Sequence, residues 1–323
     1  MNPETVRIGT RGSDLALWQA RWVQRALERL TPGLRVTMEI IKTTGDRVLD
    51  SPLSLIGDRG LFTREIEQAL LSGGIDLAVH SLKDLPTELP EGLTLGGVCE
   101  REDPRDVFIP HPRNTVRTLA GQPPGARIAT GSLRRRCQLY AIRPDVIIPE
   151  IRGNLATRMR KLEESDWHGM LLARAGVVRL GWEDRIGETL ALGTILPAVG
   201  QGALGIEIRE GDERMRLLAG GLTHRETLLG TTAERAFLRR LEGGCQVPIG
   251  TYGRIEGRAG GEGLVLDAVV GSLDGSRMVR GRTAGDSADA ICLGTGLAEQ
   301  LIARGAGTIL TEIRGIPLDP SAP

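Results

Sequence analysis

The chain has 323 residues, with 41 basic and 41 acidic side chains and a formal net charge of zero. Proteins that bind nucleic acid or an anionic membrane surface usually carry a positive excess, so this balance argues against both classes. Lysine occurs only at positions 42, 83 and 161, and every other cation is arginine. Each lysine is therefore a candidate for a role that needs a compact ammonium group.

The length predicts two or three domains. Four cysteines lie far apart without a CxxC pair, so a zinc site is not expected. The first residues form no apolar leader, and no run of 18 apolar residues occurs. These features favour a cytoplasmic protein with reduced thiols, no metal and no membrane segment.

The first hundred residues alternate strand and helix patterns, which predicts an α/β domain with a mostly parallel sheet. Ser13 is a good N-cap for a helix whose apolar residues recur at spacings of three and four. The expected strands are 6–10, 35–44 and 75–79, and the expected helices are 14–30 and 65–71.

The pattern repeats in the second hundred residues. The segment 127–132 resembles 7–13, again at a strand end that leads into a helix. Arg152-Gly153, followed by a helix and a strand at 170–173, resembles Arg59-Gly60 and the elements after it. We therefore expect two similar α/β lobes with mixed, mostly parallel sheets and a cleft at their strand ends.

The last hundred residues differ and predict a small α+β domain with an antiparallel sheet. We expect helices at 231–241 and 288–304 and strands at 247–255, 264–271 and 277–283. The segment 196–207 has the glycines of a crossover and the apolar run of a strand that returns to the first lobe. The expected domains are 1–99 with 199–222, then 100–198, then 223–323.

Three helix starts, at Ser13, Ser132 and Asn154, each have arginine nearby. A helix N-terminus offers free N–H groups and a positive dipole end, which together suit an anion. The adjacent guanidinium groups would bind several carboxylates or phosphates. Surface arginines are common in this chain, so only the recurrence supports a site at Arg11, Arg134, Arg135, Arg152 and Arg158.

Lys83 and Asp84 follow a strand in the sequence HSLKDLP, where α/β active sites often lie. Asp84 could act as an acid, a base or a stabiliser of a cation. Lys83 could bind an anion or form a Schiff base, and a plain surface ion pair is the alternative. We expect His80 to be a core histidine with its hydrogen bonds satisfied.

Cys245 lies on a loop flanked by glycines, which suits a nucleophile or a covalent attachment point. An ordinary loop cysteine is the alternative. Cys99 and Cys137 have no such setting, and Cys292, in an apolar helix, is expected in the core.

Seven segments, in this order along the chain, resemble the porphobilinogen deaminase (hydroxymethylbilane synthase) family. They are RIGTRGSDLALWQA, KTTGDRVLD, GLFTREIEQALLSGGIDLAVHSLKDLP, TGSLRRRCQL, IRGNLATR, LPAVGQGALGIE and TAERAFLRRLEGGCQVPIG. The resemblance implies two periplasmic-binding-protein-like lobes and a monomer. It also implies a transferase of porphyrin and heme biosynthesis that joins four porphobilinogens head to tail with loss of ammonia. Water then releases hydroxymethylbilane.

The same resemblance implies a dipyrromethane cofactor held by a thioether to Cys245 and used as a primer. It makes Asp84 the catalytic carboxylate, which stabilises the azafulvene cation left when ammonia departs, and it removes the Schiff-base option for Lys83. The implied cofactor contacts are Ser13, Ser81, Lys83, Asp84, Thr130, Ser132, Arg134, Arg135 and Arg158. The implied substrate contacts are Arg11, Arg152, Arg158 and Arg179.

Three positions depart from the family pattern. Gly131 replaces a serine of the more usual GTSSLRR, so no hydroxyl role carries over there. Arg59 stands where lysine is frequent, in a loop of about residues 47–60 that would cover the cleft. Gly12 replaces a larger polar residue beside Arg11.

Two other function classes fit parts of the sequence. Two lobes joined by a hinge also describe a solute-binding module without catalysis, although Cys245 would then have no purpose. A cysteine-dependent acyl transferase would need a histidine partner for Cys245, and none of the four histidines lies in a recognisable partner motif.

Overall fold

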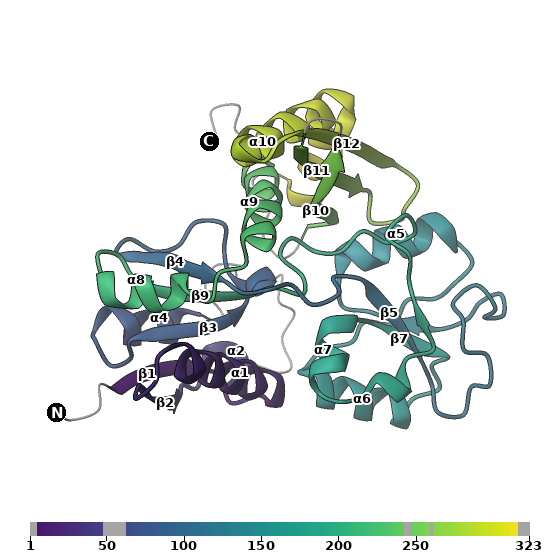
Figure 1. Ribbon diagram of the computed structural model, residues 1–323. Helices are drawn as coiled ribbons and strands as arrows, with labels where there is room; N and C mark the ends of the chain where they lie inside the picture. Colours follow the sequence, from purple (N-terminus) through teal and green to yellow (C-terminus); the bar gives the residue numbers. More distant parts are fainter. Residues whose placement is uncertain (1–4, 48–62, 242–246, 259–260, 316–323) are drawn as a thin grey trace. The chain divides into compact units, whose positions relative to one another are not determined.

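The computed structural model describes residues 5–47, 63–241, 247–258 and 261–315 (Figure 1). The chain divides into two compact units, Met1–Glu102 with Gly202–Leu228 and Asp103–Gln201 with Leu229–Pro323. The finer division into three domains stays a prediction.

The first unit contains a five-stranded sheet with the order β2-β1-β3-β9-β4. Strand β1 pairs in parallel with β2 and β3, whereas β9 is antiparallel to β3 and β4. The return of β9 confirms the crossover strand expected from the sequence. The strands are β1 (Thr5–Thr10), β2 (Arg35–Ile40), β3 (Leu77–Ser81), β4 (Leu93–Val98) and β9 (Leu204–Arg209).

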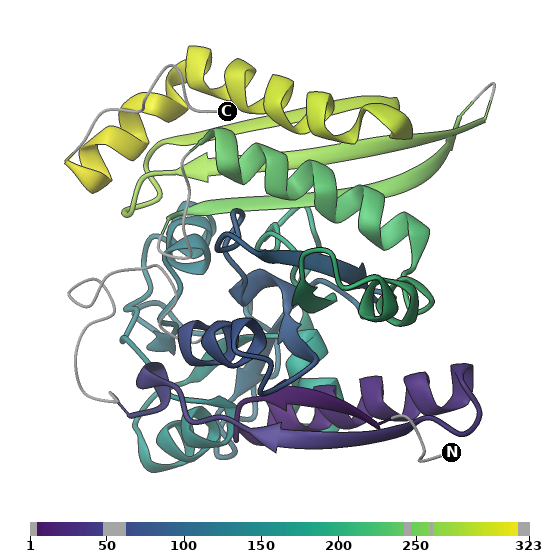
Figure 2. The same cartoon turned by 90° about the vertical axis from the view of Figure 1, so that its left-hand side faces the viewer.

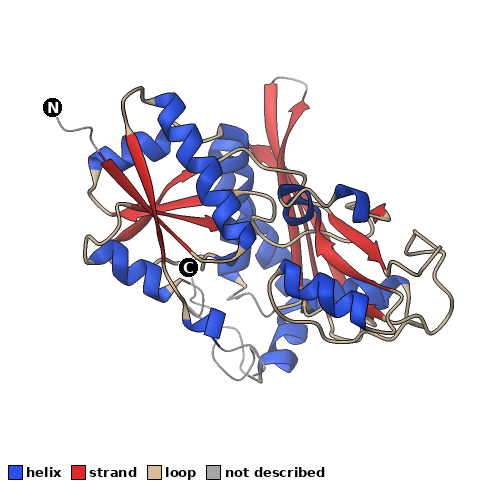
Figure 3. Cartoon of the chain, turned by 90° about the horizontal axis from the view of Figure 1, so that it is seen from below, coloured by secondary structure: helices blue, strands red, loops and turns tan. Residues whose placement is uncertain are grey.

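Helices cover both faces of this sheet (Figure 3). Apolar residues of α1 (Asp14–Leu30) and α8 (Glu213–Gly220) share a core with Leu77, Val79 and Ile206. On the opposite face, α4 (Arg64–Leu71) packs its Ile66 and Leu70 against Ala78. The alternation of β3 side chains between two cores is what a sheet covered on both faces requires.

Two element boundaries in the first unit differ from expectation. The strand expected at 35–44 ends at Ile40, and α2 (Thr44–Arg47) follows instead. The strand expected at 75–79 lies at Leu77–Ser81. It begins two residues later than expected, after the turn at Gly73 and Gly74 and after Asp76, whose side chain forms an ion pair with Arg7.

The second unit begins with a four-stranded sheet of order β6-β7-β5-β8. Only β6 and β7 are parallel, so the antiparallel share of the mixed sheets is larger than expected. The strands are β5 (Asp106–Pro110), β6 (Ile128–Ala129), β7 (Gly169–Ala173) and β8 (Glu188–Thr189), and the helices are α5 (Leu133–Ile142), α6 (Leu155–Glu164) and α7 (Arg174–Arg179).

The same unit ends in an antiparallel sheet, as the sequence predicts. Figure 2 shows helices α9 and α10 running along this sheet, and their apolar residues form one core with β11. The strands are β10 (Ile249–Arg258), β11 (Gly261–Gly271) and β12 (Met278–Asp286), and the helices are α9 (Arg225–Arg240), α10 (Ala290–Leu301) and α11 (Gly307–Arg314).

The three expected helix starts are confirmed as N-caps. The side chain of Ser13 accepts a hydrogen bond from the Ala16 N–H at 3.4 Å, and that of Ser132 accepts from Arg135 at 3.4 Å. Asn154 does the same for α6 at 2.9 Å. Such caps satisfy one of the N–H groups that a helix start leaves without a partner.

The core position expected for Cys292 is wrong, because its side chain is exposed. The buried face of α10 consists of Ala290, Gly294, Leu297, Ala298 and Leu301, and Cys292 lies away from it. Of the helices that the structure describes, none has the length and apolar character needed to cross a bilayer.

Candidate functional site

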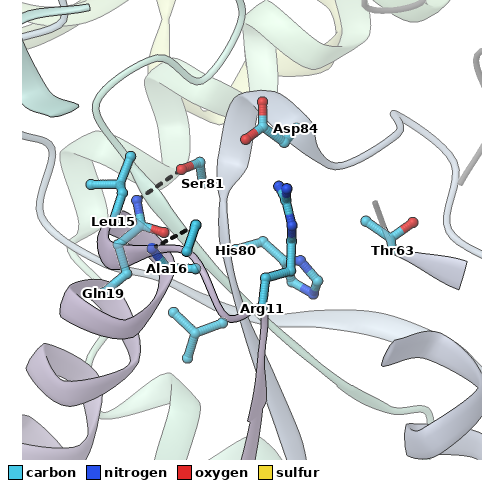
Figure 4. Close-up of a pocket in the computed structure, with 10 residues that line it drawn as sticks. Arg11, Leu15, Ala16, Gln19, Thr63, His80, Ser81 and Asp84 are labelled. Carbon is cyan, nitrogen blue, oxygen red and sulfur yellow. Dashed lines mark hydrogen bonds between the residues drawn. The ribbon is translucent and has the colours of Figure 1, made fainter. Parts of the chain in front are cut away.

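A pocket opens in the first unit where the carboxyl ends of the parallel strands β1 and β3 lie side by side. Figure 4 shows its wall, formed by the start of α1, the end of β3 and the turn that follows. The lining residues are Arg11, Ser13, Leu15, Ala16, Gln19, Thr63, Val79, His80, Ser81 and Asp84. The pocket thus brings together five residues singled out from the sequence: Arg11, Ser13, His80, Ser81 and Asp84.

One wall of the pocket suits an anion. It contains the N-terminus of α1 with its Ser13 cap, and the side chain of Arg11 enters from the residue after β1 (Figure 4). Helix N–H groups and a guanidinium both attract carboxylates. Because the helix start and the cation share one pocket, a ligand carboxylate would meet both.

The pocket also contains a negatively charged group, the carboxylate of Asp84. Asp84 ends a 3-10 turn (Leu82–Asp84) directly after β3. Leu82 and Leu85 on either side are buried in a small apolar cluster, whereas Asp84 is exposed. Leu85 is extended before Pro86, as expected for a residue before proline. The two leucines therefore anchor the turn while it presents the carboxylate.

A partly buried hydrogen bond joins helix α1 to the end of strand β3 in the pocket. The amide of Gln19, on α1, donates to the hydroxyl of Ser81 at 2.8 Å, and the Gln19 side chain is buried (Figure 4). This contact ties the end of β3 to the first helix. Gln19 was not singled out from the sequence, although a glutamine on the apolar side of an amphipathic helix is a usable signal.

His80 is a satisfied core histidine, as expected. Its Nε2 lies 3.1 Å from Oε2 of Glu207 on β9, and both side chains are buried. Sequence reasoning missed Glu207, which lies inside the predicted crossover strand. An acid between two isoleucines in a strand expected to be buried is the signal that could have identified it.

The second unit holds most of the remaining predicted contacts, and Thr130 and Ser132 form a local turn there. The Ser132 N–H donates to the Thr130 hydroxyl at 3.2 Å, just before α5. A Cβ at Gly131 would lie 2.4 Å from the carbonyl oxygen of Ile151. The departure from the family serine therefore matches a close backbone approach that only glycine permits.

Arg134 and Arg135 surround a buried acid that the sequence reasoning missed. Arg134 donates to Oδ2 of Asp106 at 2.6 Å, and Arg135 donates to Oδ1 at 2.9 Å. Gln201 donates to the same oxygen at 2.8 Å. The three charged groups carry one net positive charge. Within the described part of the chain, the Nε atoms of both arginines lack a hydrogen-bond partner.

The other predicted arginines lie near α6 and α7. Arg152 pairs with Glu150 at 2.7 Å, and Arg158 donates from Nε to the carbonyl of Gly153 at 2.8 Å. Arg179 ends α7 and is buried. Arg152 and Arg158 flank the capped start of α6, so the expected pairing of cation and helix N-terminus is present there.

Several predicted features lie outside the described residues. These are Cys245 with its glycine-flanked loop, Arg59 and most of the 47–60 loop. Lys83 is described and half-buried beside Asp84. The described residues contain no group of three His, Cys, Asp or Glu side chains suited to a metal ion.

The pocket combines groups that recognise different parts of one ligand. Arg11 and the α1 N-terminus suit carboxylates, whereas Asp84 suits an N–H group or a developing positive charge. Hydroxyl and amide groups of Ser13, Ser81 and Gln19 add neutral hydrogen bonds. Such a donor set fits a chain of pyrroles that bear carboxylate side chains.

Comparison with known proteins agrees with this chemistry. A family model described as "Porphobilinogen deaminase, dipyromethane cofactor binding domain" matches residues 6–217, and the C-terminal domain model of the same family matches residues 228–303. A porphobilinogen deaminase from Moorella thermoacetica is 48% identical over 309 residues, which cover 96% of each chain.

Solved structures give a more distant likeness. The periplasmic VFT2 domain of Bordetella pertussis BvgS matches 68% of this chain and 86% of its own, with 14% identity and a TM-score of 0.42. A probable amino-acid transporter binding protein, ytmK from Bacillus subtilis, covers 68% of this chain and 88% of its own, with 10% identity and a TM-score of 0.39.

Proposed function

Because the chain belongs to the porphobilinogen deaminase family, it is a transferase that joins porphobilinogen units into a linear tetrapyrrole, and we propose that Asp84 is its catalytic carboxylate. The observation that carries this proposal is the position of Asp84 in the pocket, on a turn anchored by buried leucines and in view of Arg11 (Figure 4). Family membership removes the solute-binding and acyl-transferase alternatives.

Asp84 would stabilise positive charge on the substrate. Loss of ammonia from porphobilinogen leaves a cation spread over the pyrrole ring, and a carboxylate near the ring N–H favours that charge. The new carbon–carbon bond then releases one proton from the attacked ring. An exposed carboxylate at this place can accept that proton and pass it to solvent or to ammonia.

The dipyrromethane cofactor fits the described residues. When bound, it supplies the terminal pyrrole carbon to which the first substrate is joined. We propose that its carboxylates are held by Ser13, Ser81 and Lys83 in the first unit. In the second unit we assign the same role to Thr130, Ser132, Arg134, Arg135 and Arg158.

The net positive charge around Asp106 supports the role of Arg134 and Arg135. One carboxylate neutralises only one of the two buried guanidinium groups, so an anion near them would complete the charge balance. Arg11, Arg152, Arg158 and Arg179 would bind the acetate and propionate groups of incoming substrate. Cys245 would hold the cofactor by a thioether.

We also propose that the protein is a cytoplasmic monomer without a nucleic-acid or membrane partner. The balanced charge of the chain supports the last point. Sedimentation of the purified enzyme measures the oligomeric state directly.

Substitution of Asp84 tests the catalytic assignment. Asp84→Asn keeps the shape but removes the charge, so kcat should fall by about 10²- to 10⁴-fold while the circular dichroism spectrum is unchanged. Asp84→Glu should retain more activity, because the charge survives and only its placement shifts. Glu91→Gln, at an exposed acid of the same unit, is the control and should turn over normally. Near-normal turnover of Asp84→Asn would show that Asp84 is not the catalytic carboxylate.

A further inference from the structure

Three titratable side chains are buried where helix α4 covers strands β3 and β9, and none has a role in the chemistry above. The exposed fractions are 6% for His80, 0% for Glu207 and 7% for Glu67. In the sheet, His80 is opposite Gly205 and Ala78 is opposite Glu207, so His80 and Glu207 share one face. Helix α4 covers that face, and its Ile66 and Leu70 pack in one apolar cluster with Ala78. Glu67 is another buried residue of α4.

Each of the two acids in this cluster has one buried carboxyl oxygen without a hydrogen-bond donor among the described residues. Glu207 has Oε2 beside Nε2 of His80, but its Oε1 has no partner among the described residues. Oε1 of Glu67 is likewise buried and, within those residues, unpartnered. Two buried carboxylates at one face of the sheet, each with an unpaired oxygen, are strongly disfavoured when both are ionised, and one added proton relieves their repulsion.

The surroundings indicate which acid holds that proton. Glu207 lies 3.1 Å from a ring nitrogen of His80 that can donate a hydrogen bond to it, whereas no donor reaches the buried Oε1 of Glu67 among the described residues. Burial raises the pKa of Glu67, and the charge of Glu207 acts in the same direction, outweighing the opposite effects of Thr63, His80 and Arg64. The other charged groups that line the adjoining pocket are Arg11 and Asp84.

We propose that Glu67, Glu207 and His80 form a buried unit that keeps one proton on Glu67 and an ionised Glu207 on His80, and that this unit positions the pocket for the porphobilinogen reaction. The three are positioning residues. His80 and Thr63 line the pocket itself, and the Glu67 N–H donates to the Thr63 carbonyl at 2.8 Å. The residue after His80 is Ser81, and the turn to Asp84 follows.

The two glutamates should therefore respond differently to the same isosteric change. Glu67→Gln imitates the protonated acid, since its amide can donate where the carboxyl O–H does, and should leave kcat and KM close to wild type. Glu207→Gln removes the charge that orients His80, and should lower kcat by about 10- to 100-fold through misplacement of the Asp84 turn. His80→Gln, which keeps an N–H donor, should retain more activity than His80→Leu.

An infrared spectrum supplies a readout that does not depend on activity. Wild type and Glu207→Gln should show the C=O stretch of a buried protonated carboxyl near neutral pH, and Glu67→Gln should lack it. Asp76→Asn is the matched control, because Asp76 pairs with Arg7 just before the other end of β3. It should lower stability without changing kcat.

The kinetic arm rests on the proposed role of Asp84, whereas the infrared arm does not. If Asp84→Asn turns over normally while the infrared band behaves as stated, the catalytic assignment fails and the proton assignment stands. Equal damage from both glutamine variants, a silent Glu207→Gln, or a carboxyl band that survives in Glu67→Gln would overturn the proposal.

Discussion

Arg134 donates a 2.6 Å hydrogen bond to Asp106, and both side chains are almost completely buried, with exposed fractions of 4% and 0%. Arg135 and Gln201 donate to the other oxygen of the same carboxylate. The start of α5, which carries the proposed anion contacts, is therefore held to β5 by the fully buried carboxylate of Asp106. The proposed anion contacts Arg134 and Arg135 thus also hold the buried Asp106, so we expect the site and the stability of this unit to depend on the same charged residues.

Asp106→Asn should destabilise the protein strongly. The amide keeps the shape but leaves two buried guanidinium groups without a counter-charge, and breaking a buried pair in this way costs about 3–5 kcal/mol of the free energy of unfolding. Urea denaturation measures the loss. Glu164→Gln, which removes an exposed pair with Arg160, should change the midpoint little. If the two variants lost equal unfolding free energy, the buried carboxylate of Asp106 would stabilise the protein no more than an exposed ion pair does, which would contradict the prediction.

The contribution of Asp106 should depend on pH with a definite sign. Burial alone would raise the pKa of Asp106, but Arg134 and Arg135 outweigh it and hold the pKa well below its ordinary range. A folded-state pKa below the unfolded value gives stabilisation that is complete above about pH 4 and is lost as pH falls through the folded value. The gap in unfolding free energy between wild type and Asp106→Asn should thus shrink in acid. A gap that widens as pH falls would refute this reading.

Local signals in the sequence predicted much of the fold and part of the site. The caps at Ser13, Ser132 and Asn154 were predictable because an N-cap is decided within four residues. The position of Asp84 at a strand end follows from the strand itself and from Pro86. The family motifs identified the chemistry. None of these inferences requires knowledge of which distant segments meet.

Long-range contacts explain what the sequence did not show. Asp106 precedes Arg134 by 28 residues and Gln201 by 95, so no spacing rule connects them. Glu207 and His80 meet only because β9 returns beside β3, 127 residues later. The error at Cys292 has a different cause. Its place in an apolar helix suggested a core position, but the spacing of Ala290, Gly294 and Leu297 puts the buried face elsewhere.

Gly131→Ala should destabilise the second unit and disturb the start of α5. The new Cβ would lie 2.4 Å from a backbone oxygen of Ile151, and a backbone atom cannot move aside as a flexible side chain can. Overpacking of this kind costs about 1–3 kcal/mol. Thermal unfolding measures the effect. Gly193→Ala is the control in the same unit, since nothing lies within 4 Å of its added Cβ and its φ is not positive. A Gly131→Ala variant as stable as the control would show that the segment relaxes freely.

Thiol counting tests the proposed cofactor attachment together with the burial of the other cysteines. In the native protein Cys292 should react rapidly with dithionitrobenzoate because it is exposed, whereas Cys99 and Cys137 should not. Burial raises the pKa of the Cys137 thiol to about 12, so almost no reactive thiolate is present. After denaturation, a thioether at Cys245 leaves three of the four cysteines titratable. Intact-mass spectrometry of the same sample should show a two-pyrrole adduct that Cys245→Ser lacks. Four thiols and an unmodified mass, in protein made by cells that synthesise porphobilinogen, would place the primer somewhere other than Cys245.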